Sequence, residues 1–302
     1  MVSQTSSSYD GEQERAWGPA EPAAQRGDQL AAGYQVVVHM RRGHRLDVYD
    51  LWSLERGARC VGKTLRPERA GDEVAAARLR TEGMLLETLT HPHLVRGYET
   101  VLTSERPRPL VVIETLPGRT VSHLLGEHGR LSAGDAAMLG VQLCSVLGYL
   151  HRHEWVHLDV KPANVVELAG RAVLLDLSMA CRRGERSTGG TFDYLSPEQA
   201  RGDPVSEAAD VWGLGITLHE VVSGATPWSR HSHRRGGSAG TRRYPQLEER
   251  VPPLRRRRRL PPALSELVHD CLDPSPTARP TIDEITERLV AMTGVDPRTA
   301  ER

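Results

Sequence analysis

Lysine is nearly absent from this sequence of 302 residues. Of its 39 basic residues, only Lys63 and Lys161 are lysines, and the other 37 are arginines. A bias this strong towards arginine is typical of a GC-rich genome. Arginine does not replace lysine where a compact ammonium group must contact a phosphate or a small anionic centre. The two lysines therefore mark candidate functional positions.

Aromatic residues are also few, and the formal net charge is zero. Aromatic side chains make up 4% of the chain and Phe192 is its single phenylalanine. The core must therefore be built mainly from leucine, valine and alanine. The 39 acidic residues balance the 39 basic ones, which argues against a nucleic-acid-binding protein on bulk electrostatics. We expect no nucleic-acid partner.

Cysteine pairs and long apolar runs are missing as well. The four cysteines show no C-x-x-C spacing, so the sequence indicates neither a zinc site nor a disulfide framework. No apolar run reaches the roughly 18 residues of a membrane span, and the N-terminus has no hydrophobic stretch after its charged part. We therefore expect no membrane insertion, no attached sensor or anchor, and a location in the reducing cytoplasm.

The composition changes at Tyr34. Residues 1–33 are rich in serine, glycine, proline and glutamate without apolar periodicity, which predicts a disordered tail. From Tyr34 the pattern predicts strand, turn, strand, turn and strand as far as Lys63. Apolar periodicity then predicts helices over residues 72–89 and 132–153, the second with Ser132 as its N-cap. Shorter helices are expected over residues 263–272 and 282–292.

The stretch from His157 to Asn164 combines an acid, a base and an amide at short spacings. Asp159 is followed two residues later by Lys161 and five residues later by Asn164, and Pro162 prevents a helix. We expect the three side chains to converge. Aspartate can accept a hydroxyl proton, lysine can neutralise a phosphate oxygen, and asparagine can ligate a hard cation through its carbonyl. A polar loop around a buried aspartate is the alternative interpretation.

The same stretch resembles the catalytic loop of protein kinases, H-R-D-x-x-x-x-N, and Lys161 is the version found in serine/threonine kinases. Leu158 departs from the pattern, because arginine is usual there. Three further motifs occur in the family's order along the chain. Lys63, as in V-A-I-K, precedes the loop, and two motifs come after it: Asp176-Leu177-Ser178 in place of D-F-G, and Ser196-Pro197-Glu198 in place of A-P-E. The chain is thus similar to bacterial Hanks-type serine/threonine protein kinases.

The resemblance covers residues 34–292 and implies an α+β fold of two lobes. The small lobe, rich in β-structure with one helix, would span residues 34–116. The larger, mostly helical lobe would span residues 117–292, and residues 293–302 would form a C-terminal tail. Arg279 matches the arginine that pairs with the glutamate of the A-P-E motif, here Glu198, and this buried pair would be structural.

The resemblance also implies ATP and Mg²⁺ as cofactors. Lys63, paired with Glu82, would position the ATP phosphates, and the hinge backbone would bind adenine. In the hairpin that carries G-x-G-x-x-G-x-V in the family, Arg41 and Leu46 replace the flanking glycines. Arg41 either supplies charge to the phosphates or is a solvated surface residue. The nucleotide-binding residues implied with Lys63 and Glu82 are Gly43, Val48, Val61, Glu114, Leu116, Val166 and Asp176.

The implied catalytic residues are Asp159, Lys161, Asn164 and Thr191. Asp159 would accept the hydroxyl proton and Lys161 would stabilise charge on the γ-phosphoryl group, with Thr191 beside both. Asn164 and Asp176 would hold Mg²⁺. Phosphorylation of serine or threonine in protein substrates, including the chain itself, is the activity that this set implies.

Three alternatives remain open. The degraded glycine loop and the altered D-F-G motif are compatible with an inactive pseudokinase that acts as a scaffold. A kinase-fold phosphotransferase acting on a small molecule is less favoured, because the segment from Thr191 to Glu198 shapes a peptide site in protein kinases. The arginine run Arg255–Arg259 could bind nucleic acid, although a solvated loop is favoured. The protein substrate and the oligomeric state are left open.

Leu158 has a regulatory implication. In the family, the arginine at this position binds activation-loop phosphate, so its absence predicts a weaker dependence on that modification. Ser187 and Thr188 are accordingly expected to be autophosphorylated without acting as strict on-switches.

Overall fold

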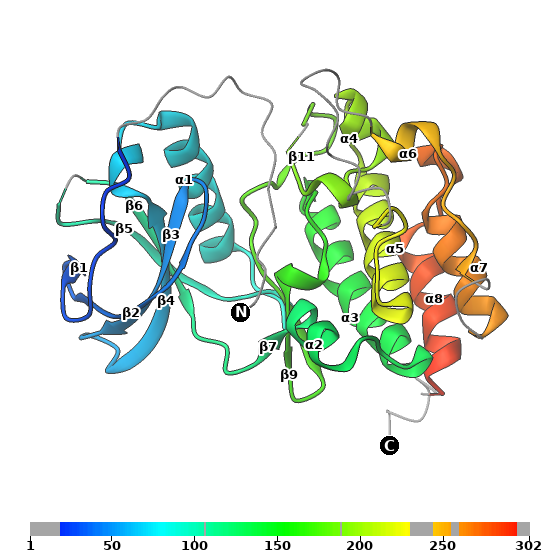
Figure 1. Ribbon diagram of the computed structural model, residues 1–302, viewed down its shortest axis with the longest axis horizontal. Coiled ribbons are helices and arrows are strands. Elements are labelled where there is room, and N and C mark those ends of the chain that lie inside the picture. The colour runs from blue at the N-terminus through cyan, green and yellow to red at the C-terminus, as the bar shows by residue number, and fades with distance from the viewer. Residues whose placement is uncertain (1–18, 106, 188, 230–243, 255–259, 295–302) are drawn as a thin grey trace. The chain divides into compact units, whose positions relative to one another are not determined.

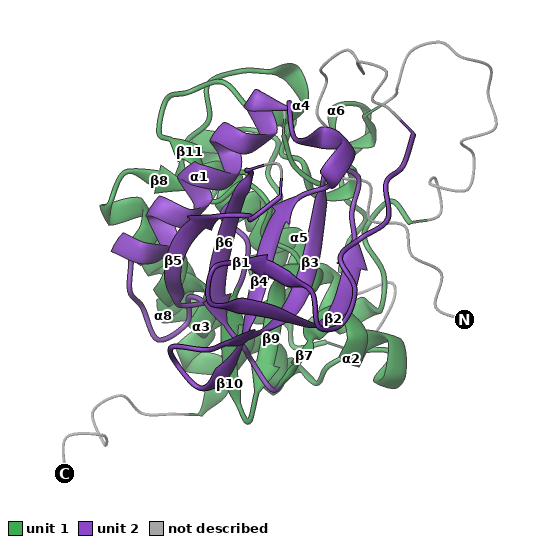
Figure 2. Cartoon of the chain, turned by 90° about the vertical axis from the view of Figure 1, so that its left-hand side faces the viewer, with its two compact units in different colours: residues 1–11, 118–174, 179–302 green, residues 12–117, 175–178 purple. Residues whose placement is uncertain are grey.

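The structure, a computed structural model, describes residues 19–105, 107–187, 189–229, 244–254 and 260–294 (Figure 1). The chain divides into two compact units (Figure 2). The sheet unit contains the described residues up to Pro117 together with residues 175–178. The helical unit contains residues 118–174 and the described residues from Met179 onward. Each unit is built around its own core and is described by itself.

The sheet unit is a six-stranded antiparallel sheet with one long helix, in the order β1-β2-β3-β4-β6-β5. Its apolar cluster consists of alternate side chains such as Val36, Leu51 and Cys60, as expected for strands with one covered face. Helix α1 packs against β5 and β6 (Figure 1). The elements are β1 (Gln29–Ala31), β2 (Tyr34–Arg42), β3 (Leu46–Ser53), β4 (Ala58–Leu65), α1 (Glu73–Thr88), β5 (Gly97–Leu102) and β6 (Pro109–Glu114).

Helix α1 begins where its sequence provides a cap. Asp72 accepts a hydrogen bond from the backbone N–H of Ala75 at 3.0 Å, which satisfies one of the unpaired donors of the first turn. Leu79, Leu85 and Leu86 are buried, so the predicted apolar stripe is the packed face of this helix. The helix predicted over residues 72–89 is confirmed.

The prediction of a disordered tail as far as residue 33 is wrong at its end. Residues 29–31 form β1, which pairs with the start of β2. Leu30 and Ala31 are buried in the cluster of the sheet, and Ala23 and Ala24 pack against the same cluster. These few apolar side chains are too short a pattern to detect in a polar segment, but they cover a sheet face that would otherwise lie open. Residues 1–18 lie outside the described residues.

The helical unit is organised around α3 and α5. Helix α5 is buried on nearly every side, including Val211, Leu214 and Ile216, as expected for a helix that is apolar all round. Helix α3 packs against α5 and α8 (Figure 1). The elements are β7 (Arg119–Thr120), α2 (Val121–His128), α3 (Ala133–Arg152), β8 (Trp155–Val156), β9 (Val165–Leu168), β10 (Arg171–Leu174), β11 (Cys181–Arg182), α4 (Pro197–Arg201), α5 (Glu207–Ser223), α6 (Pro245–Glu248), α7 (Pro262–Cys271) and α8 (Ile282–Thr293).

Helix α3 follows the predicted span of residues 132–153 closely. The Ser132 side chain accepts from the backbone N–H of Asp135 at 3.1 Å, which confirms the predicted N-cap. By length and composition α3 could cross a membrane, although the sequence was expected to contain no such run. Half of its apolar window is buried inside the protein, and core helices pass the same test. The apolar character of α3 is therefore explained by packing in the helical unit.

A buried ion pair ties α4 to a segment that precedes α8. Arg279 donates from Nη1 and Nη2 to the two carboxylate oxygens of Glu198 at 2.7 and 2.9 Å, and Nη1 also donates to the carbonyl of Ala208. The guanidinium lies over the ring of Trp212, 5.1 Å from its centroid. The predicted pair of Glu198 and Arg279 is confirmed. The expected α+β fold, with a β-rich part carrying one long helix and a larger, mostly helical part, is also confirmed.

Removing one partner of this pair leaves a buried guanidinium uncompensated. We expect Glu198→Ala to lower the free energy of unfolding by about 3–5 kcal/mol, measured by urea denaturation. The matched control is Asp270→Ala, which removes the carboxylate of a half-exposed pair with Arg288 and should cost less than about 1 kcal/mol. Equal losses in the two variants would contradict this account.

Candidate active site

The candidate catalytic loop is held by a single buried carboxylate. Asp210 lies in the first turn of α5 and is 1% exposed. Its Oδ1 accepts from the backbone N–H of Leu158, and its Oδ2 accepts from the backbone N–H of His157, both at 2.8 Å. The Nε2 atom of His151 lies 2.8 Å from the same Oδ2. Burial opposes ionisation of this carboxyl, but these hydrogen bonds outweigh burial and lower its pKa.

Leu158 adopts a backbone conformation that is unusual for a branched residue. Its φ is 64°, in the left-handed region that costs an ordinary residue about 1–2 kcal/mol. The hydrogen bond from Leu158 to Asp210 stabilises this conformation. The Leu158 side chain is buried in an apolar cluster with Val156, Val205 and Ala209, against which Met179 and Cys181 pack. An apolar contact thus occupies the position where the family has a phosphate-binding arginine.

Asp159 is the acceptor at which the candidate catalytic residues converge. Its Oδ1 accepts from the backbone N–H of Thr191 at 3.1 Å and from the Thr191 hydroxyl at 2.7 Å. Its Oδ2 accepts from Nζ of Lys161 at 2.6 Å and from Nδ2 of Asn164 at 2.9 Å. Lys161 also contacts the Thr191 hydroxyl. All four predicted catalytic residues therefore meet within the helical unit.

The sheet unit carries a second charged cluster of its own. Nζ of Lys63 lies 2.6 Å from Oε1 of Glu82 on α1 and 3.5 Å from Oδ1 of Asp176. Burial alone would lower the pKa of Lys63, but the charges of Asp176 and Glu82 outweigh burial and raise it. Lys63 is therefore a stable cation at neutral pH, as a phosphate-binding lysine must be.

The strand register places an apolar surface beside Lys63. Val48 is the register partner of Lys63, and Val61, two residues before Lys63, points to the same face of the sheet. Val38 shares this face through its partner Asp50 and is 48% exposed, a position that the sequence reading missed. Val48 and Val61 are half-buried, and the Lys63 side chain beside them is 12% exposed. A row of valines next to this lysine suits a flat apolar ring attached to a charged group.

The remaining nucleotide-binding candidates are divided between the two units. Gly43 donates its N–H to the carbonyl of Leu46 at 2.7 Å and closes the hairpin turn. Glu114 ends β6 and accepts from the backbone N–H of Arg96 at 2.9 Å, and half-buried Leu116 follows it. Val166, in contrast, is a buried residue of β9 in the helical unit.

Two side chains have the donor chemistry for Mg²⁺. Asp176 has a φ of 65° and a third of its side chain exposed, and its Oδ1 accepts from the N–H of Ser178 at 3.2 Å. Asn164 uses its amide nitrogen on Asp159, which turns its carbonyl oxygen away as the available hard ligand. Among the described residues, no cluster of three or more His, Cys, Asp or Glu could enclose a metal. Asp176 in the sheet unit and Asn164 in the helical unit each provide the kind of oxygen that suits Mg²⁺, which is usually held by one or two carboxylates together with substrate phosphates.

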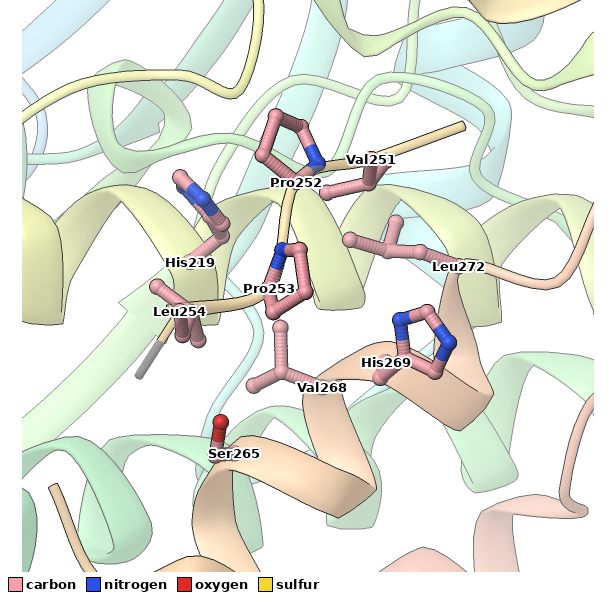
Figure 3. A pocket seen from close by; sticks show the side chains of 9 residues that line it. All are labelled: His219, Val251, Pro252, Pro253, Leu254, Ser265, Val268, His269 and Leu272. Atoms are coloured by element: carbon pink, nitrogen blue, oxygen red, sulfur yellow. The ribbon is translucent and has the colours of Figure 1, made fainter. Parts of the chain in front are cut away.

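A small cavity in the helical unit is separate from these residues (Figure 3). It lies between α5, α7 and the segment 251–254. Apolar side chains of that segment line it together with three polar side chains, His219 of α5 and Ser265 and His269 of α7. None of the predicted site residues lines it.

The sequence reading did not assign a role to Asp210 or His151. The sequence does contain one indication. Asp210 directly precedes a run of mostly apolar residues, and a carboxylate that is buried with them requires several hydrogen-bond donors. Its donors lie more than 50 residues earlier in the chain, and spacing alone cannot identify them.

Comparison with known proteins is consistent with this geometry. The protein kinase domain family matches residues 34–290. The chain is 33% identical over 269 residues to the serine/threonine-protein kinase PknB of Mycolicibacterium smegmatis, covering 84% of this chain and 40% of that protein. It is 31% identical over 291 residues to PknB of Mycobacterium tuberculosis, covering 91% of this chain and 44% of that protein. The chain thus spans less than half the length of these relatives.

The contribution of Asp210 should depend on pH. Its folded-state pKa is lowered from 3.8, so its stabilising effect is complete above that pH and is lost as the pH falls through the lowered value. We expect Asp210→Asn to reduce the free energy of unfolding by roughly 3 kcal/mol at pH 7, because three donors lose a charged acceptor. Urea denaturation should show the same difference from pH 7 to 4.5 and a smaller one at pH 3. A difference independent of pH would contradict this assignment.

Proposed function

Because the chain belongs to the protein kinase family, we propose that it transfers the γ-phosphoryl group of ATP to serine or threonine hydroxyls of protein substrates. The observation that carries this proposal is the convergence of Thr191, Lys161 and Asn164 on the Asp159 carboxylate. Such an arrangement suits a base that must be held in one orientation beside a cation.

The roles of the residues follow from their contacts. Asp159 would accept the proton of the substrate hydroxyl, and the N–H and hydroxyl of Thr191 would fix the orientation of its carboxylate. Lys161 would stabilise negative charge on the transferred phosphoryl group. Lys63, oriented by Glu82, would hold the α- and β-phosphates. Asp176 and Asn164 would hold Mg²⁺, which would neutralise phosphate charge when bound.

The retained charged residues support a kinase over a pseudokinase scaffold. Lys63, Glu82 and Asp176 form one contact cluster, and Asp159 forms the other. A scaffold would have no need to keep Lys63 against the fully buried carboxylate of Glu82, since a buried charge costs desolvation free energy. The relatives named above are serine/threonine-protein kinases, which also favours an enzyme.

The activity can be tested by phosphate incorporation. We expect the full chain with Mg-ATP to label itself or a generic basic protein on serine or threonine. Lys63→Met should abolish labelling, and Asp159→Asn should reduce its rate by about 10²–10⁴-fold because the proton acceptor is lost. Asp283→Asn, an exposed carboxylate in the first turn of α8, is the matched control and should keep full activity. No labelling by the unaltered chain would favour the scaffold.

The activation segment, which the resemblance places between Asp176 and Glu198, should not require phosphorylation for kinase activity. It is already held by the pairing of β11 with β8, by the Leu158 cluster, and by Arg182, whose guanidinium lies 4.1 Å from the Trp155 ring centroid. We expect the double variant Ser187→Ala with Thr188→Ala to retain most of the labelling rate on a protein substrate. Thr188 lies outside the described residues. Loss of activity in this variant, with normal thermal unfolding, would show that phosphate is needed.

A further inference from the structure

The hairpin of β2 and β3 has an arginine where the kinase glycine loop begins. Arg41 is the register partner of Val48, and Val48 is the register partner of Lys63 on β4. Register partners in antiparallel strands point to the same face of a sheet. Arg41 and Lys63 therefore lie on one face, two strands apart, with roughly 10 Å between their backbones. Both side chains are long enough to approach one bound group.

The opposite face of the hairpin is fixed by a buried carboxylate. Asp47 is fully buried, and its Oδ1 and Oδ2 accept from Nε and Nη2 of Arg42, both at 2.8 Å. Nε2 of His39 lies 3.0 Å from the same Oδ1. Because neighbouring residues of a strand alternate in direction, Arg42 on this face places Arg41 on the face of Lys63.

The hairpin is also tied to neighbouring segments. Nη1 of Arg42 donates to the backbone carbonyl of Glu21 at 2.7 Å. The carbonyl of His44, at the turn, lies 3.4 Å from Nη1 of Arg66. A glycine loop binds phosphates through a mobile backbone, whereas this hairpin is held by side chains. The exposed position of Arg41 is thereby kept towards the face of Lys63.

The charges on that face do not suit a polyphosphate without a further cation. Lys63 is the central cation, but Glu82 and Asp176 bring two negative charges within contact distance of it. Without Mg²⁺ on Asp176, the cluster therefore has a net charge of about −1, which repels a nucleoside triphosphate. The other pair on this face, Asp50 with Arg59, is neutral. Within the hairpin of β2 and β3, Arg41 adds a positive charge to the sheet face that carries Lys63.

We propose that Arg41 binds the phosphates of the nucleotide and replaces, by its charge, the backbone amides that a glycine loop would offer. This inference rests on the proposed function, since it concerns the same nucleotide. Guanidinium groups bind phosphate through paired, charge-assisted hydrogen bonds, so a side chain is a sufficient substitute for the amides. The ligand class is a nucleoside di- or triphosphate, and the contribution of Arg41 should grow with the number of phosphates.

The test is the affinity of the full chain for adenosine, ADP and Mg-ATP, measured by isothermal titration calorimetry. We expect Arg41→Ala to weaken Mg-ATP binding roughly tenfold, to weaken ADP less, and to leave adenosine unchanged. Arg41→Lys should recover part of the loss. The ATP affinity of the unaltered chain should also fall more steeply with salt than that of Arg41→Ala.

The control removes the same charge elsewhere in the sheet unit. Arg80 is an exposed residue of α1 that lies two positions before Glu82 and hence on another side of the helix. Arg80→Ala should bind Mg-ATP like the unaltered chain. Equal weakening by Arg80→Ala and Arg41→Ala would show a general charge effect and overturn the inference.

Two further outcomes separate this inference from the proposed function. If the unaltered chain binds Mg-ATP and Arg41→Ala binds it equally well, Arg41 is a surface residue and only this inference fails. If the unaltered chain binds no nucleotide, both proposals fail. Thermal unfolding of Arg41→Ala, expected to match that of the unaltered chain, excludes a folding defect as the cause of weaker binding.

Discussion

The hydrogen bonds of the Asp210 carboxylate are the constraint on which the candidate active site depends. They fix the backbone of His157 and Leu158, and Leu158 is held in a conformation that a free chain would avoid. Asp159 follows directly, so its direction is determined by this turn. The rigid support is α5, which is buried on nearly every side and cannot shift without disturbing the core. The core of the helical unit thus determines the geometry of a polar site.

Much of this could be predicted from sequence, because the information was local or carried by family motifs. Helix α3 was predicted from its apolar stripe and from the cap at Ser132, both of which act within a few residues. Strand β1 and the role of Asp210 could not be predicted in this way, because each depends on partners supplied by the fold. The pair of Glu198 and Arg279 joins residues 81 positions apart and was predicted only because the motif identified both.

The two lysines illustrate why residue type, and not charge alone, is informative. Lys63 and Lys161 each lie within 2.6 Å of a carboxylate oxygen, in clusters where a planar guanidinium would need more room. Elsewhere in the described residues arginines make the surface pairs and the bidentate contacts, as Arg42 and Arg279 do. A chain that uses arginine for nearly every cation has therefore kept lysine where a point charge is required.

Leu158 and Arg41 are departures from the family pattern that change how a segment is held. With Leu158, the activation segment packs on an apolar cluster, and this contact needs no phosphate to form. With Arg41, the hairpin loses the backbone freedom of glycine but gains a charge, and the Arg42–Asp47 pair supplies the rigidity that makes the charge useful. The Leu158 contact is present whenever the chain is folded, whereas the charge of Arg41 would act only when a nucleotide is bound. The first departure therefore concerns how the chain holds its own segment, and the second concerns how it would hold a ligand.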